Sequence, residues 1–260
     1  MAMMFESAPD LQSHARRAGR MMLDFLYPPL CATCRAPVSE PHALCSECWK
    51  AIAFLEGPMC VICGLPFELD PGSDTVCGAC HAHPPPFDSA RSVMRYDDAS
   101  RKSILALKRA DRLDLALPFA RWLERAGKPI IAQADAILPV PLHWRRLWTR
   151  RYNQSAVLAR LISRHSGKPL DLLSLRRVRP TPSQGEMVSA KARRRNVRGA
   201  FNVDPARQPF VAEKTVLLID DVLTTGATVA ACARALKRAG AARVLVLTLA
   251  RVVRPLPGDI

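Results

Sequence analysis

The stretch that decides the fold is VLLIDDVLTTGAT, residues 216–228. Its aliphatic start, residues 216–219, is typical of a central strand in a parallel sheet, which is buried on both faces. The strand delivers Asp220 and Asp221 to a loop rich in Thr and Gly, and we expect a helix to begin at Thr228. Ligands of open parallel sheets bind at such carboxyl ends of strands. The stretch therefore predicts both an α/β fold and the place of its site.

The loop after the two acids has the chemistry of an anion site. Backbone N–H groups at the start of a helix hold phosphate, and Thr hydroxyls add donors. Gly226 lets the main chain approach a phosphate without a Cβ in the way. Adjacent carboxylates accept hydrogen bonds from two vicinal hydroxyls, as on a ribose. The string lacks the Gly-Lys-Ser/Thr of a Walker A loop and the G-x-G-x-x-G of a dinucleotide fold, so it predicts a sugar-phosphate site of another kind.

Strand-like and helix-like segments alternate along the chain from residue 88 onward. Such alternation predicts a parallel sheet in an α/β domain. The expected strands are 90–96, 136–140, 172–178, 214–219 and 243–250, and the expected helices are 103–107, 113–123, 153–163 and 228–239.

Eight of the nine cysteines form four Cys-x-x-Cys pairs, and Cys232 stands alone. Two cysteines three residues apart present both sulfurs to one ion, and two such pairs close a tetrahedral Cys₄ zinc site. In a reducing compartment, eight clustered cysteines predict two metal sites and not disulfides. The gaps of 10, 11 and 13 residues between the pairs allow sequential or interleaved pairing. The predicted ligands are Cys31, Cys34, Cys45, Cys48, Cys60, Cys63, Cys77 and Cys80.

We expect these zinc sites to be structural. Residues 28–83 are rich in Cys and Pro and offer little core, and a segment of this size needs metal to fold. A closed Cys₄ site leaves no open position for a substrate, and an iron–sulfur cluster is the alternative occupant. We interpret the nearby His42, His81 and His83 as surface residues, and Cys232 as a small buried hydrophobe.

Composition divides the chain into three parts. Residues 1–27 are expected to form a short amphipathic leader helix, because Asp24 interrupts the apolar run and no cleavage site follows. We place the zinc-binding domain at 28–83 and the α/β domain at 84–260, beginning at the stiff run Pro84-Pro85-Pro86. No apolar run approaches the ~18–20 residues of a membrane helix. We therefore expect a cytoplasmic protein without stable membrane insertion.

The net charge of +15 predicts attraction to a polyanion such as nucleic acid, a nucleotide or an acidic membrane surface. Most of this charge lies in residues 141–200, which hold fifteen Lys and Arg and two acids. Trp144, Trp148 and Tyr152 lie among these arginines, as in proteins that stack single-stranded nucleic acid on aromatic side chains. Their spacing of four residues also fits one helix face packed into a core, and we favour core packing.

The string at 216–228 resembles the phosphoribosyl-diphosphate (PRPP) signature of type I phosphoribosyltransferases: four hydrophobics, two acids and a Thr-Thr-Gly loop. Together with the tandem cysteine pairs ahead of it, the chain resembles the ComF family, also known as GntX-like or competence protein F. The family usually shows Arg-Gly-Phe-Asn-Gln where residues 150–154 read RRYNQ, so one Gly is lost while the Asn-Gln pair stays. The other matching stretches are 138–143, 151–154, Thr181 with Gln184, and 193–201.

The resemblance implies a fold, a ligand and a set of site residues. The fold is a parallel-sheet phosphoribosyltransferase-like domain behind a small double zinc ribbon, and the ligand is PRPP with Mg²⁺ or a related ribose-5-phosphate compound. Asp220 and Asp221 would hold the ribose hydroxyls and act as the catalytic pair. The residues expected around the 5′-phosphate are Thr224, Thr225, Gly226, Ala227 and Thr228.

Further residues are candidates for contact with pyrophosphate or for a lid. Residues 139–146 follow a strand, as the pyrophosphate loop of phosphoribosyltransferases does, and 180–198 correspond to the flexible hood of the family. The plainer interpretation of 139–146 is a rigid exit from the strand, and that of 180–198 is a solvated basic loop. Lys108 is more simply an exposed lysine. The candidates are Lys108, Pro141, Arg145, Lys191 and Arg193.

Two functions fit these features. In the first, the protein is a pentosyl-transferring enzyme of nucleotide metabolism, in which a nitrogen of an unknown acceptor displaces pyrophosphate from PRPP. In the second, a degenerate PRPP pocket belongs to a non-catalytic adaptor that binds single-stranded DNA or a competence helicase. The resemblance also implies a role in DNA uptake. We favour PRPP binding and lean towards an enzyme.

Overall fold

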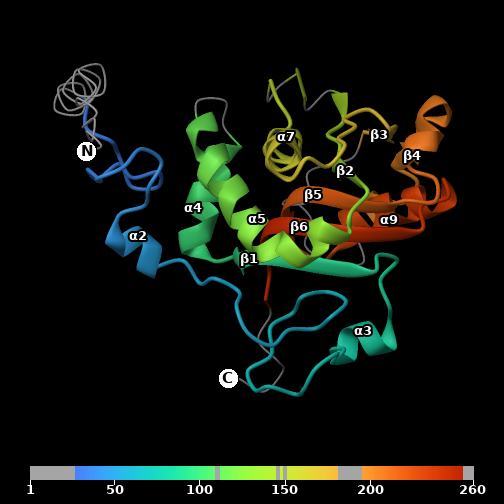
Figure 1. Cartoon of the computed structure of the whole chain (residues 1–260), viewed down its shortest axis with the longest axis horizontal. Coiled ribbons are helices and arrows are strands. Elements are labelled where there is room, and N and C mark those ends of the chain that lie inside the picture. The colour runs from blue at the N-terminus through green and yellow to red at the C-terminus, as the bar shows by residue number, and fades with distance from the viewer. Residues whose placement is uncertain (1–26, 109–111, 145–146, 149–150, 181–194, 254–260) are drawn as a thin grey trace, which may run out of the picture. The chain divides into compact units, whose positions relative to one another are not determined.

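The computed structural model describes residues 27–108, 112–144, 147–148, 151–180 and 195–253 (Figure 1). The chain divides into two compact units, residues 1–49 and 50–260. Apart from Tyr27, the leader helix expected at 1–27 lies outside the described residues. Within the described ranges, no helix is both long and apolar enough to cross a bilayer.

A four-stranded sheet with the order β1-β6-β5-β2 forms the centre of the second unit. All neighbouring strands run parallel, which confirms the expected α/β class. Strands β5 and β6 occupy the middle positions, and their aliphatic runs are buried there. The strands are β1 (Ser89–Arg95), β2 (Ala136–Pro139), β5 (Thr215–Leu223) and β6 (Arg243–Arg251).

Helices cover both faces of this sheet. Val244 and Val246 of β6 belong to the core cluster of α9, whereas a Cβ on Gly127 of α5 would lie 2.5 Å from the side chain of Leu247. Because successive side chains of a strand point to opposite faces, α5 and α9 lie on opposite faces of the sheet. The longer helices are α4 (Asp98–Leu107), α5 (Ala116–Gln133), α7 (Gln154–Ser166) and α9 (Ala227–Arg238).

Several elements differ from the expected boundaries. Helix α5 continues through Pro129 to Gln133, well past residue 123. Strand β5 continues through both acids to Leu223. Strand β3 (Leu175–Arg177) lies within the strand expected at 172–178, but it pairs antiparallel with β4 (Phe201–Val203), which the pattern missed. The start of the helix expected at 113–123 is a 3₁₀ turn, η1 (Leu113–Leu115), and the 3₁₀ turn η3 (Pro205–Phe210) was not expected.

The second group of cysteines lies in the same compact unit as the sheet. Its segment runs along the outer edge of β1, where Ala90 N–H donates to Ile62 O at 2.7 Å and Leu55 N–H donates to Val93 O at 2.9 Å. Gly64 has a φ of +68°, and a Cβ there would lie 2.6 Å from Ala90 O, so only glycine fits. Two short helices accompany the cysteine groups: α2 (Ser46–Lys50) and α3 (Gly78–Ala82).

Candidate functional site

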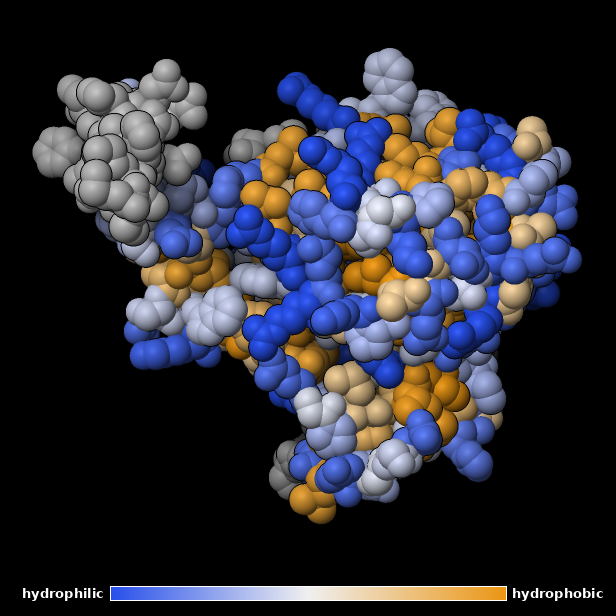
Figure 2. Space-filling view, viewed as in Figure 1, coloured by the Kyte–Doolittle hydropathy of each residue, from blue (hydrophilic) through white to orange (hydrophobic). Residues whose placement is uncertain are grey.

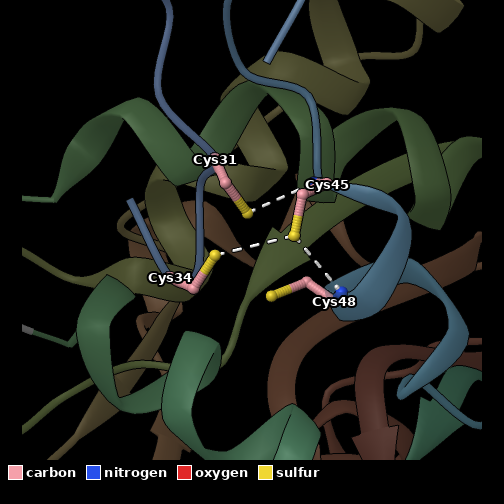
Figure 3. A group of neighbouring side chains, drawn as sticks. All are labelled: Cys31, Cys34, Cys45 and Cys48. Carbon is pink, nitrogen blue, oxygen red and sulfur yellow. Dashed lines mark hydrogen bonds between the residues drawn. The ribbon is translucent and has the colours of Figure 1, made fainter. Parts of the chain in front are cut away.

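The eight cysteines gather in two groups of four, and in each group the sulfur atoms lie within 4.8 Å of one another. Figure 3 shows the first group, with its sulfurs turned towards a common space. Of the two pairings that spacing allows, the structure has the sequential one. The groups are Cys31, Cys34, Cys45 and Cys48, and Cys60, Cys63, Cys77 and Cys80.

The electrostatics of both groups fit a bound cation. Burial raises the pKa of Cys31, but backbone N–H donors outweigh it and bring the pKa down to about 6. One of these donors, Cys45 N–H, lies 3.3 Å from Cys31 Sγ. In contrast, burial and neighbouring sulfurs raise the pKa of Cys48 and of Cys80. Four crowded thiols do not all ionise without a cation, and a closed set of four thiolates is what structural Zn²⁺ takes.

The two acids of the decisive stretch lie where β2 leaves β5. The pairing of these strands ends at Pro139 and Ile219, and Val140 N–H still donates to Ile219 O at 2.9 Å. From Asp220 onward, β5 pairs only with β6 among the described strands. Asp220 and Asp221 therefore stand at an opening in the sheet, as ligand-binding residues of parallel sheets do.

Each acid already has a polar partner from another part of the chain. Ser155 Oγ donates to Asp220 Oδ1 at 3.1 Å, and Lys108 Nζ lies 2.9 Å from Asp221 Oδ2. Burial and the negative charge of Asp221 raise the pKa of Asp220 to about 7. At neutral pH Asp220 is therefore protonated part of the time, and Lys108 forms an ion pair with Asp221.

Lys108 reaches this place because the start of α7 and the residues just before it hold the end of α4. Tyr152 O–H donates to Leu107 O, and Gln154 Nε2 donates to Lys108 O at 3.4 Å. The sequence had offered Lys108 as a candidate for phosphate contact, and the structure places it on the acid pair. Ser155 was missed, and the neighbouring Asn-Gln pair was the one signal that pointed to this turn.

Residues 224–226, which the sequence predicts to hold a phosphate and which we call the phosphate loop, connect the end of β5 to α9. Gly226 has a φ of +72°, a left-handed conformation that favours glycine. A Cβ at Gly226 would meet nothing closer than Leu223 Cδ1 at 3.9 Å, so conformation and not space requires the glycine. The Oγ1 atom of Thr225 is buried and has no hydrogen-bond partner among the described residues. A buried donor without a partner needs a physical explanation, and a ligand oxygen at the start of α9 would supply one.

Of the remaining candidates for contact with pyrophosphate, only one lies among the described residues. Pro141 is buried directly after β2, whereas Arg145, Lys191 and Arg193 lie outside the described residues. Core packing of the two tryptophans was wrong: Trp144 is 59% exposed and Trp148 is 82% exposed. His81 and His83 are exposed as expected, and Cys232 is fully buried in the core.

The two tryptophans lie one helical turn apart, because Leu147 N–H donates to His143 O at 3.1 Å. They stand within the most basic part of the chain. Figure 2 shows that hydrophilic side chains cover much of the visible face of the molecule, with hydrophobic ones in smaller groups between them.

Comparisons with known proteins agree with both parts of the structure. A model described as double zinc ribbon domain matches residues 22–81, and one described as phosphoribosyl transferase domain matches residues 153–254. DNA utilization protein YhgH of Salmonella typhi is 35% identical over 236 residues, which cover 87% of this chain and 98% of that protein. Competence protein F of Haemophilus influenzae is 30% identical over 227 residues (85% and 96%), and competence protein ComFC of Bacillus subtilis is 26% identical over 216 residues (80% and 84%).

Proposed function

Because the chain belongs to the ComF family, whose members include DNA utilization and competence proteins, we propose that it binds PRPP or a related ribose-5-phosphate compound at residues 220–228. In this proposal Asp220 and Asp221 accept hydrogen bonds from the ribose hydroxyls. The phosphate loop and the first N–H groups of α9 receive the 5′-phosphate. The names of the relatives connect the family with the use and uptake of DNA.

The unpaired hydroxyl of Thr225 is the observation that carries this proposal. A buried donor without a partner costs about 1–3 kcal/mol, and a phosphate oxygen removes that cost. The hydroxyl adjoins Gly226, which is left-handed, and the acids lie shortly before the loop, on β5. A sugar phosphate has both groups that this arrangement receives: hydroxyls for the two acids and a phosphate for the loop.

We further propose that the bound PRPP reacts with a nitrogen nucleophile. The nitrogen forms a bond to C1 of the ribose as the bond from C1 to pyrophosphate breaks, and the electron pair leaves with the pyrophosphate. The Mg²⁺ that accompanies PRPP is part of the substrate. The chain contributes the position of the reactants and electrostatic stabilisation. Lys108, which lies beside Asp221, is our candidate for the cation that stabilises the leaving pyrophosphate. Pro141, Arg145, Lys191 and Arg193 remain candidates for the same contact.

Release of pyrophosphate from PRPP tests the enzymatic part of the proposal. We expect PRPP-dependent release with one member of a panel of nucleobases and ammonia, and loss of release in Asp220→Ala and Asp221→Ala. Asp114→Ala, which removes an exposed acid paired with Arg112, serves as the control and should leave release unchanged. If Asp220→Ala and Asp221→Ala release pyrophosphate as fast as the wild type and the control do, the assignment of the acids is contradicted.

A second function, binding of single-stranded DNA, is favoured by the exposed Trp144 and Trp148 in the basic segment. Stacking of a base on an aromatic side chain contributes about 1–3 kcal/mol. We therefore expect Trp148→Ala to weaken binding of a labelled oligonucleotide about tenfold, and added salt to weaken it further. Leu69→Ala removes another exposed apolar side chain and is the control. Equal binding by Trp148→Ala and the wild type contradicts this function.

A further inference from the structure

We propose that Arg251 is a positioning residue through which the second zinc tetrad (Cys60, Cys63, Cys77 and Cys80) holds the phosphate loop in its binding shape. The proposal rests on the ligand site proposed above. It gives the second zinc ribbon a role in ligand binding as well as in folding.

The first link joins the tetrad to Arg251. Arg251 is 8% exposed, and its Nη1 donates to the carbonyl oxygen of Cys63. That carbonyl belongs to the Cys60–Cys63 turn, in which Cys63 N–H donates to Cys60 Sγ at 3.5 Å. A buried guanidinium without acceptors is costly, and because Arg251 Nε is buried without a partner, the Cys63 carbonyl is the one acceptor of this side chain among the described residues. The metal-bound turn therefore fixes the place of the Arg251 side chain.

A second guanidinium supports the same turn. Arg91 Nη1 donates to Val61 O at 3.2 Å and to Ala90 O at 2.8 Å. Ile62 and Cys63 also pack against the main core cluster of the sheet. The turn is thus attached to the sheet by two arginines and by apolar contact, so a change in its shape reaches the strands.

The second link joins Arg251 to the phosphate loop through the backbone. Arg251 is the last residue of β6 and pairs in register with Leu223, the last residue of β5. The next N–H, of Val252, donates to Leu223 O at 3.0 Å. Leu223 directly precedes Thr224, the first residue of the phosphate loop. The side chain of Arg251 is therefore held by the zinc turn, while the N–H of the next residue, Val252, holds the residue that leads into the loop.

The end of β5 depends on this support more than the rest of the strand does. Up to Ile219 the strand has neighbours on both sides, β2 and β6. Beyond Ile219, the described strands leave it with β6 alone. If the Cys60–Cys63 turn loosens, Arg251 loses its acceptor and the end of β6 shifts. The end of β5 then shifts too, and it leads directly into the phosphate loop.

The direct test compares two substitutions on the same strand. Arg251→Met keeps the length of the side chain and removes its hydrogen bonds. Arg243→Met does the same at the other end of β6, where the exposed guanidinium donates to Gln133 Oε1 at 3.0 Å. PRPP affinity is measured by calorimetry on the full zinc-loaded chain, together with zinc content and melting temperature.

We expect Arg251→Met to keep two zinc ions and to bind PRPP at least about tenfold more weakly. A tenfold loss of affinity is comparable to the loss of about one hydrogen bond to a charged group. Arg243→Met should bind as the wild type does, and Arg251→Lys should recover part of the affinity. Wild-type affinity in Arg251→Met overturns the proposal. Absence of PRPP binding in the wild type itself refutes the proposed ligand site, which is a different result.

Amide hydrogen exchange in the wild type covers the case in which Arg251→Met does not fold. Zinc is withdrawn stepwise with a mild chelator, and exchange is followed in residues 222–228 and in α5. When the second tetrad loses its ion, exchange should quicken in 222–228 while α5 stays protected. Unchanged exchange in 222–228 after that loss overturns the proposal. Because coupling is reciprocal, PRPP should also slow the withdrawal of zinc from that tetrad.

Discussion

Asp220 stabilises the ligand-free protein least above neutral pH, where its carboxyl is ionised. Burial and the charge of Asp221 raise its pKa to about 7, whereas an aspartate in an unfolded chain has a pKa of about 4. A group whose folded pKa is raised contributes stability at low pH, and that contribution is lost as pH rises through about 7. The residue is thus arranged for a ligand and not for the ligand-free fold.

Asp220→Asn is therefore expected to stabilise the ligand-free protein at about pH 8 by about 1 kcal/mol, or about 3 °C in melting temperature. The gain should shrink at about pH 6, where Asp220 holds its proton in the wild type. Melting curves at the two pH values check this. A variant that melts below the wild type at the higher pH contradicts the account of Asp220.

Thr225→Val separates ligand binding from stability. Valine has nearly the same shape and removes a buried hydroxyl that has no partner among the described residues, so the unfolding free energy should stay the same or rise. PRPP affinity should fall about tenfold or more, because a bond to a charged oxygen is lost. Calorimetry and urea unfolding measure the two effects.

Thr248→Val is the matched control for this change. The Thr248 hydroxyl is buried and lies 2.7 Å from Ser92 Oγ, so its removal should destabilise the fold and leave PRPP affinity unchanged. If Thr225→Val instead destabilises the protein and binds PRPP normally, the hydroxyl has a structural role.

Local pattern predicted only part of the candidate site. The acids, Thr225 and Gly226 lie in one string whose chemistry is visible in the sequence. Lys108 comes to the acids from the end of α4, and no local spacing predicts such a contact. The tryptophans failed for a related reason: a spacing of four residues shows that Trp144 and Trp148 share a face but not what lies opposite that face.

At the scale of elements, the turn from β5 into α9 depends on the left-handed conformation of Gly226. Gly226→Ala should lower the unfolding free energy by about 1 kcal/mol, because a Cβ disfavours this conformation although there is space for it. Gly226→Asn should cost less, since asparagine tolerates this conformation better. Urea unfolding of the two variants checks the order, and an Ala variant as stable as the Asn variant contradicts it.

The elements that the sequence predicted well are those with a long, regular pattern. The aliphatic runs of β5 and β6 and the apolar face of α7 gave these elements to within a few residues. Helix α5 continues ten residues beyond the expected end at 123 and contains Pro129, because Gly127, Ile130 and Ile131 pack its second half into the core. Strand β4 has three residues, of which Phe201 and Val203 point inward, and that is too short for a periodicity.

At the scale of the whole molecule, two zinc ions should be needed for the fold. Because proton binding competes with metal at the thiols, and the pKa values of Cys48 and Cys80 are raised, zinc should be released as the pH falls. We expect two zinc ions per chain by elemental analysis, and loss of cooperative melting on chelation. The visible absorbance of an iron–sulfur cluster in the purified protein contradicts the assignment of zinc.

Binding of PRPP by the intact protein tests the central claim most directly. Calorimetry on the full zinc-loaded chain should show binding of PRPP with one site per chain in the wild type, and none in the Asp220→Ala/Asp221→Ala double variant. Ribose-5-phosphate should bind to the same site more weakly, since it lacks the pyrophosphate. A wild-type protein that shows no heat with either compound, or a double variant that binds both as well as the wild type does, contradicts the account.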